Sequence, residues 1–110
     1  MTRVLDRERY LVQVLVPLYD NDGERFPPAE FARIRRELTA RFGGVTAYTR
    51  APAQGIWEDE DGRMHHDDVI VVEVMVDRLD ERWWSAYRAE LAERFRQDSF
   101  VVRATPFSLL

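Results

Sequence analysis

Polar residues that interrupt otherwise apolar β-type runs are the best candidates for chemistry in this chain. Gln13 lies within the apolar run 10–18, Glu73 within the run 69–76, and Arg103 within the last β-type run. A carboxylate on an apolar sheet face is costly to bury unless an arginine or a ligand neutralises it. The pattern has two interpretations. In the first, Glu73 forms an ion pair that sets the register of an interface. In the second, Glu73 and Gln13 line a pocket, and Glu73 acts there as a general base or ligand anchor.

The run from Val45 to Trp57 adds candidates on the same sheet. We expect Arg50 or Tyr48 to project from the face that carries Glu73. Arg50 offers the carboxylate an alternative ion-pair partner to Arg103, and Tyr48 offers a phenol for proton transfer. We therefore take Tyr48 as a catalytic candidate beside Glu73, and Arg50 as a ligand-binding candidate.

The segment His65-His66-Asp67-Asp68 is the densest group of metal-ligand side chains. In a strand, two of these side chains point to each face, and a zinc site needs three or four ligands. We therefore expect no metal site. His66 and Asp68 are better placed for acid–base chemistry, which makes His66 a third catalytic candidate. A solvated strand end explains the same residues. The chain has no phosphate-cradling glycine loop ahead of a helix, so we expect no cofactor.

Composition excludes several classes of protein. A chain of 110 residues, with 45% apolar and 33% charged residues, is typical of one globular domain. Its net charge of −4 disfavours nucleic-acid and anionic-membrane partners. The absence of cysteine excludes disulfides and thiol nucleophiles. No apolar run approaches the roughly 18 residues of a spanning helix, and Met1–Arg9 lacks the apolar middle of a signal peptide. We expect a cytoplasmic protein without a membrane partner.

A near-repeat predicts how these residues are positioned. The segment Arg35–Phe42 returns as Arg88–Phe95, with Arg, Glu, Leu, Arg and Phe in register. Each copy ends a helical stretch that follows one apolar run and precedes another. The chain is therefore predicted to be a single domain, residues 1–110, with two βαβ-like halves at about 8–50 and 64–107.

The elements of the two halves follow from periodicity and caps. Proline opens a helix at Pro27-Pro28 that ends at Gly43-Gly44, and Asp80 is the N-cap of a helix from Glu81 to Arg96. Four strands are predicted, over residues 10–18, 45–57, 64–76 and 100–107. The order β-α-β-β-α-β predicts an α+β, ferredoxin-like fold with a four-stranded antiparallel sheet. Both helices are expected on one face, with the last strand at one edge, followed by the first, third and second.

The opposite, helix-free face of this sheet is predicted to remain partly apolar. On the first and third predicted strands, the side that carries only valine and isoleucine is expected to face the helices. The other sides carry Leu11, Leu15, Val69, Val71 and Met75 around Gln13 and Glu73. An exposed apolar patch of this kind marks an interface. We expect homodimerisation through the helix-free sheet face; cover by the N-terminal arm is the alternative. RNA recognition by the sheet would need stacking aromatic side chains, and these positions of the central strands hold Val, Leu, Gln and Glu instead.

The hairpin region resembles a known family. The segment Gly55–Arg63 is similar to a motif of roughly Gly-x-Trp-x-(acidic)-x-Asp-Gly-Arg found in small uncharacterised bacterial domains, which are known only as a domain of unknown function. The segment Tyr87–Val101 resembles their ending, so the likeness covers about half of the chain. We expect the chain to depart from many members by lacking their secretory leader, and in the region before the hairpin. The family has no assigned activity, so the resemblance implies only a candidate region with Trp57, Arg63 and Gln97.

Two hypotheses for function follow. A dimeric ferredoxin-like shell is similar to cofactor-independent monooxygenases, small isomerases and ligand-sensing domains, and one fold hosts many functions. The first hypothesis is a noncatalytic homodimeric domain that binds a small molecule or a protein partner. The alternative is a small cofactor-independent enzyme, monooxygenase- or isomerase-like, with a pocket at the sheet face or dimer seam. The ligand-binding candidates are Gln13, Glu73, Arg103, Arg50, Trp57 and Arg63.

Overall fold

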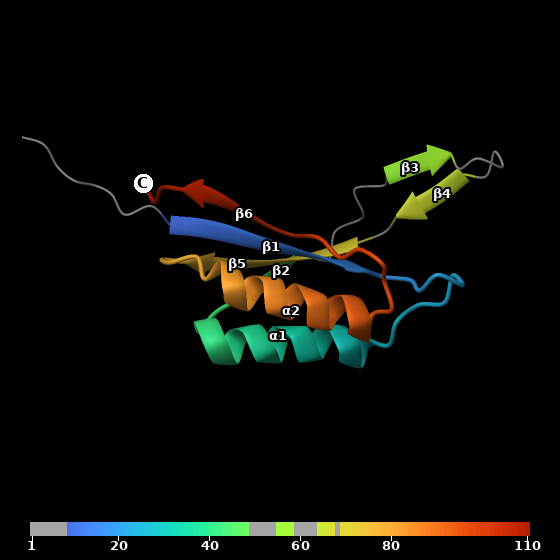
Figure 1. Ribbon diagram of the computed structural model, residues 1–110, viewed down its shortest axis with the longest axis horizontal. Helices are drawn as coiled ribbons and strands as arrows, with labels where there is room; N and C mark the ends of the chain where they lie inside the picture. Colours follow the sequence, from blue (N-terminus) through green and yellow to red (C-terminus); the bar gives the residue numbers. More distant parts are fainter. Residues whose placement is uncertain (1–8, 49–54, 59–63, 68) are drawn as a thin grey trace, which may run out of the picture.

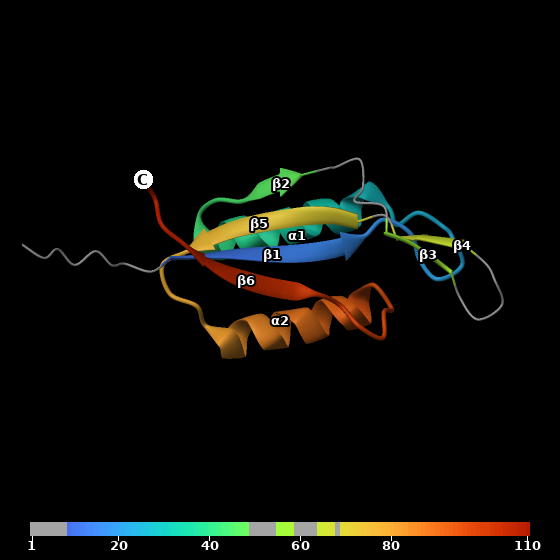
Figure 2. The ribbon, with the colours of Figure 1, turned by 90° about the horizontal axis from the view of Figure 1, so that it is seen from above.

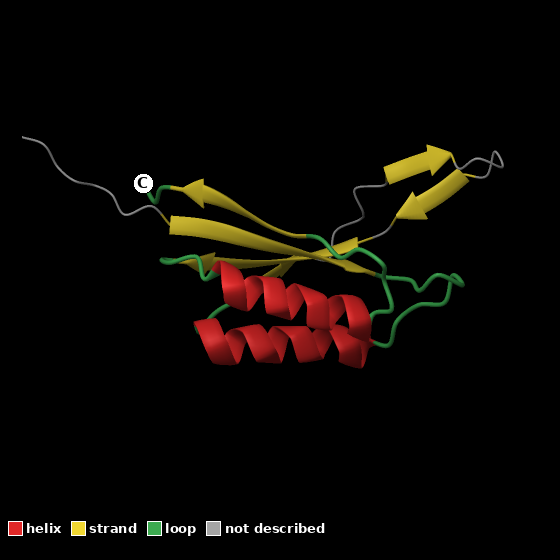
Figure 3. Cartoon of the chain, viewed as in Figure 1, coloured by secondary structure: helices red, strands yellow, loops and turns green. Residues whose placement is uncertain are grey.

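Two layers, a β-sheet and a pair of helices, make up the body of the protein (Figures 1 and 3). The computed structural model describes residues 9–48, 55–58, 64–67 and 69–110. Its elements in chain order are β1 (Arg9–Pro17), α1 (Pro28–Phe42), β2 (Thr46–Tyr48), β3 (Gly55–Glu58), β4 (Met64–Asp67), β5 (Val69–Val76), α2 (Glu81–Arg94) and β6 (Val102–Phe107). Both helices cover one face of the main sheet. The predicted α+β class is confirmed.

The main sheet is antiparallel throughout, with the strand order β2-β5-β1-β6 (Figure 2). In the two central strands, Gln13 of β1 is the register partner of Glu73 of β5. On the other side of β1, Gln13 is also the partner of Arg103 in β6. The edge strand β2 has only three residues, so three long strands form most of the sheet.

The hairpin region differs from the sequence prediction, because each of two predicted long strands is broken in two. The run 45–57 becomes β2 and β3, and the run 64–76 becomes β4 and β5. Strands β3 and β4 pair only with each other, from Gly55↔Asp67 to Glu58↔Met64, in a separate two-stranded sheet. Residues 49–54, between β2 and β3, lie outside the described part of the chain.

The core lies between the sheet and the helices, as the alternation of apolar residues predicts. On β1 and β5 every second side chain is buried, and the side chains between them are not. The helices contribute Ile34 and Leu38 from α1, and Trp84, Tyr87 and Leu91 from α2. Each valine or leucine that is fully buried contributes about 1.5–3 kcal/mol to folding, so this packing is the main source of stability.

Local sequence features set the helix ends. At the start of α2 the side chain of Asp80 accepts a hydrogen bond from the Trp83 backbone N–H at 3.1 Å, which confirms the predicted cap. Gly43 ends α1 with a φ of 83°, a left-handed conformation that glycine adopts without strain. The second helix was predicted to reach Arg96. It ends at Arg94 because Arg96 itself takes a left-handed φ of 53°.

A buried arginine joins the two helices. The Nη1 and Nη2 atoms of Arg94 donate to the two carboxylate oxygens of Glu37 at 2.8 and 3.0 Å. The Tyr87 hydroxyl donates to the same carboxylate at 2.9 Å, and Arg94 also donates to Glu90 at 2.6 Å. The Arg94 side chain is only 9% exposed. A bidentate pair in this setting fixes how α1 and α2 lie against each other.

This network perturbs the titration of its members. Burial by itself raises the pKa of Glu37. Hydrogen bonds from Arg94 and Tyr87, together with the charges of Arg94 and Arg33, outweigh burial, so the pKa lies below its ordinary value of 4.5. The pKa of Tyr87 is raised by burial and by its hydrogen bond to Glu37, so the phenol remains a donor. The carboxylate therefore stabilises the fold above its unfolded pKa, and this stability is lost as the pH falls through the lower folded pKa.

We predict that Glu37→Gln lowers the free energy of unfolding at neutral pH by about 2 kcal/mol, because hydrogen bonds to charged groups are lost. The difference between wild type and variant should shrink below pH 4.5, where the wild-type carboxylate begins to lose its contribution. Urea unfolding at neutral pH and at about pH 3 measures both effects. Glu93→Gln, an exposed change on α2, is the control. A difference that stays constant across this pH range would contradict the assignment.

Candidate functional site

The helix-free face of the main sheet carries a polar row that crosses the strands. The Gln13 Nε2 donates to Glu73 Oε2 at 2.6 Å, and the Arg103 Nε donates to Gln13 Oε1 at 2.8 Å. Thr46 of β2 is the register partner of Glu73, so the row extends to the edge strand. The structure thus brings together Gln13, Glu73 and Arg103, three of the predicted site residues.

The row differs from the predicted ion pair in one respect. Among the described residues no ion pair joins Glu73 to Arg103, because Gln13 lies between them in the sheet and bridges them with its amide. One carboxylate oxygen of Glu73 and the terminal nitrogens of Arg103 make no hydrogen bond to the described residues. This arrangement holds a carboxylate and a guanidinium at a set spacing, and both remain able to bind a further group.

Apolar side chains surround the polar row. Leu11, Leu15, Val69 and Val71 are half-buried on this face, and Met75 is 59% exposed. Successive side chains of a strand point to opposite faces of the sheet. The neighbouring residues Val12, Val14 and Val72 face the helices and are buried, so these apolar side chains lie on the helix-free face. The face therefore combines an apolar background with one charged and hydrogen-bonded row.

The remaining predicted residues do not join this row as far as the structure describes them. In β2, the Tyr48 backbone pairs with Val71, two positions along the strands from the Thr46–Glu73 pair of the polar row. Trp57 pairs with His65, and Ile56 with His66, in the separate β3–β4 sheet. His66 and Trp57 thus belong to a different sheet from Glu73. Arg50, Arg63 and Asp68 lie outside the described residues.

Two further sequence features have structural roles in the described part of the chain. The Gln97 side chain donates to the Phe95 carbonyl at 3.0 Å and so satisfies the end of α2. Trp83 of α2 is half-buried, and the Arg41 guanidinium lies 4.3 Å from its ring centre. Within residues 9–48, 55–58, 64–67 and 69–110 no three potential metal ligands cluster, and no helix is long and apolar enough to cross a membrane.

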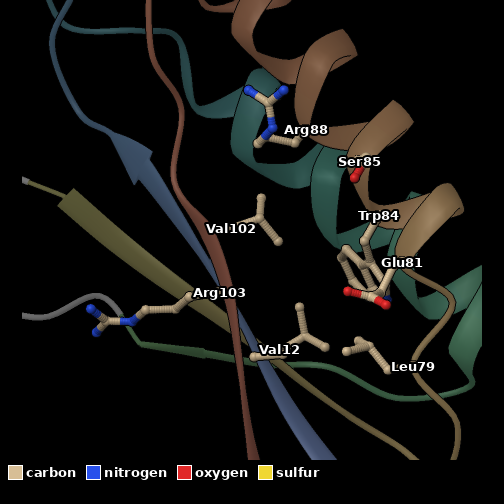
Figure 4. A pocket seen from close by; sticks show the side chains of 9 residues that line it. Val12, Leu79, Glu81, Trp84, Ser85, Arg88, Val102 and Arg103 are labelled. Atoms are coloured by element: carbon tan, nitrogen blue, oxygen red, sulfur yellow. The ribbon is translucent and has the colours of Figure 1, made fainter.

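A cavity that sequence reasoning missed lies on the other side of the sheet, between α2 and β6 (Figure 4). Its volume is about 330 Å3, and its lining comprises Val12, Leu79, Glu81, Trp84, Ser85, Arg88, Val102, Arg103 and Ala104. The side chain of Arg103 points away from it, toward the polar row. The spacing of Glu81, Ser85 and Arg88 along one side of α2 was visible in the sequence. The opposing wall was not, because it comes from β1 and β6.

Comparison with known proteins supports the fold. No protein-family model matches the chain, and no curated protein does. The chain is similar to a phage SAM lyase in complex with S-methyl-5'-thioadenosine, with 16% identity, a TM-score of 0.57 and coverage of 99% of this chain and 94% of that chain. A phage SAM lyase in the apo state gives 14% identity, a TM-score of 0.61 and coverage of 96% and 86%. At these identities the likeness shows a shared small α+β fold.

We predict that Gln13→Ala lowers the free energy of unfolding by about 1–2 kcal/mol, because both side-chain hydrogen bonds of the polar row are lost. Thr105→Ala, on the same face of β6, should have a smaller effect, since no hydrogen bond of its side chain is lost. Urea unfolding at low protein concentration compares the two variants. Equal losses of unfolding free energy in the two variants would show that the hydrogen bonds of the polar row contribute nothing to stability.

Proposed function

We propose that the protein is a noncatalytic homodimeric domain that binds a small molecule, with ferredoxin-like topology and association through the helix-free sheet face. The strand order β2-β5-β1-β6 with both helices on one face supports the topology. The polar row of Gln13, Glu73 and Arg103, which apolar side chains surround on the helix-free face, supports association of two chains. This observation carries the proposal.

Charge complementarity favours a second copy of the chain as the occupant of this face. Strands β6 and β5 flank β1, so Arg103 and Glu73 lie on either side of Gln13, each about 4.8 Å away across the sheet. A two-fold axis parallel to β1 and between two facing sheets would place Arg103 of each protomer opposite Glu73 of its partner. Such an isologous contact would pair the guanidinium and carboxylate groups that are not paired within one chain. The apolar side chains on both sides of the row would pack across the same interface.

We predict a solution mass near twice 13.0 kDa by light scattering, retained across a dilution series. The single variants Glu73→Arg and Arg103→Glu should each weaken the dimer, because like charges would face each other across the two-fold axis. The double variant should restore association, since it exchanges the two charges and keeps their complementarity. Ala89→Glu, an exposed change on α2, is the control. A monomeric wild type, or a double variant no better than the singles, would contradict the proposed interface.

A second candidate function, that of a small enzyme, is favoured by one observation. Two of the structural matches are to a phage SAM lyase, one of them in complex with S-methyl-5'-thioadenosine, and each of the two spans most of both chains. We propose as the alternative that this chain also binds an adenosyl sulfur compound. Under this alternative, Glu73 is the first residue to test as a general base.

We predict under this alternative that S-methyl-5'-thioadenosine or SAM raises the melting temperature, with a stabilisation of about 2.7 kcal/mol at a ligand concentration of 100 times Kd. Adenosine and methionine are the controls for the two halves of SAM. Chromatography of SAM incubated with the protein separates the two functions. Consumption of SAM that is lost in Glu73→Gln would support the enzyme. An unshifted melting temperature and intact SAM would contradict it.

A further inference from the structure

The cavity between α2 and β6 has the features of a ligand site separate from the sheet face. Val12 and Val102 project into it from the sheet, and Trp84 and Leu79 close it on the helix side (Figure 4). Its volume of about 330 Å3 corresponds to roughly ten water molecules at about 30 Å3 each. Ligand pockets of about 300–1,000 Å3 with apolar walls and a few polar groups hold small molecules.

Opposite charges lie toward the two ends of the cavity. Glu81 lies near Leu79, Arg88 lies toward the other end, and the Ser85 hydroxyl is between them (Figure 4). A helix rises about 1.5 Å per residue, so the backbones of Glu81 and Arg88 are roughly 10 Å apart. Within the described part of the chain, neither side chain makes an ion pair or hydrogen bond. This differs from Glu37 and Arg94, which satisfy each other in the helix interface.

An unpaired donor in the wall independently indicates a ligand. Trp84 is 5% exposed, and its Nε1 is buried without a hydrogen-bond partner among the described residues. A buried donor without an acceptor costs about 1–3 kcal/mol. The indole lies along the cavity wall beside Glu81 (Figure 4). An acceptor atom on a bound molecule would remove this cost, because no protein group competes for the Nε1 hydrogen.

We propose that this cavity binds an elongated zwitterion of dipeptide size, which rests on the small-molecule role proposed above and names its site and ligand class. The cationic end of the ligand pairs with Glu81, and its anionic end pairs with Arg88. A carbonyl between them accepts from Trp84 Nε1, and apolar side chains of the ligand contact Val12 and Val102. The polar row on the opposite sheet face takes no part, so binding does not require dissociation of a dimer.

Three dipeptide probes test the ligand class on the full chain. The free dipeptide of two leucines carries both charges, its N-acetyl form lacks the cation, and its C-terminal amide lacks the anion. Titration followed by 1H–15N NMR should shift the indole N–H resonance of Trp84, which Trp84→Phe identifies by its absence. The wild type should bind the free dipeptide about 10-fold more tightly than either blocked form, since one charged hydrogen bond is lost in each.

Matched variants assign each end of the ligand. In Glu81→Gln, the free dipeptide should no longer bind more tightly than its N-acetyl form. In Arg88→Gln, the free dipeptide should no longer bind more tightly than its C-terminal amide. Glu93→Gln and Arg82→Gln change the same residue types at exposed positions of α2 outside the cavity and should leave both preferences intact. All four side chains are exposed, so the variants should fold.

The outcomes separate this inference from the proposed function. Equal affinities for the three probes, or no shift of the Trp84 indole with any of them, would overturn the zwitterion site. A dimer by light scattering would then leave the proposed dimer standing, and binding of S-methyl-5'-thioadenosine would support the enzymatic alternative. Conversely, a monomeric protein that binds the free dipeptide with the predicted preferences would support the cavity and contradict the dimer.

Discussion

Burial of one side of the two central strands is the constraint on which the rest of the structure depends. Val12 and Val14 of β1, with Val72 and Val74 of β5, are almost fully shielded by the helices. A shift of one residue in β1 or β5 would move the buried valines of that strand to the helix-free face and bury Gln13 or Glu73 instead. The same register places the polar row on the opposite face. The position of that row is therefore a consequence of core packing rather than of its own hydrogen bonds.

The helix pair shows how a near-repeat in sequence becomes an asymmetric structure. Arg41 and Arg94 occupy equivalent positions in the two copies, yet only Arg94 is held between the helices by Glu37 and Glu90. Arg41 instead covers the Trp83 ring and lies 3.9 Å from Asp80. In Figure 2, α1 lies beneath β5 and α2 lies beside β6, so equivalent residues of the two helices meet different neighbours. The Glu37 network anchors one side of α2, and the side that carries Glu81 faces the cavity.

The two proposed surfaces lie on opposite sides of one sheet, and each would bind its partner through a different set of interactions. The helix-free face is broad, with an apolar background and a carboxylate and a guanidinium, not paired with each other in one chain, that a second copy could complement. The cavity is small and has charged groups at its two ends around an apolar wall. Arg103 illustrates the separation, because its backbone lines the cavity and its side chain donates to Gln13 on the other face.

The pattern of residues along the sequence predicted most of the helices and strands, the residues that cap the helices, and the buried side of each strand. These features depend on residues that are close together in the sequence. The sequence also indicated Gln13, Glu73 and Arg103, since polar residues in apolar strands are conspicuous. The tertiary structure decided the rest. It separated β3 and β4 from the main sheet, and its strand register inserted the Gln13 amide where an ion pair was predicted. The cavity at Trp84 depends on the distance between α2 and β6, and that distance follows from how whole elements pack rather than from any local pattern of residues.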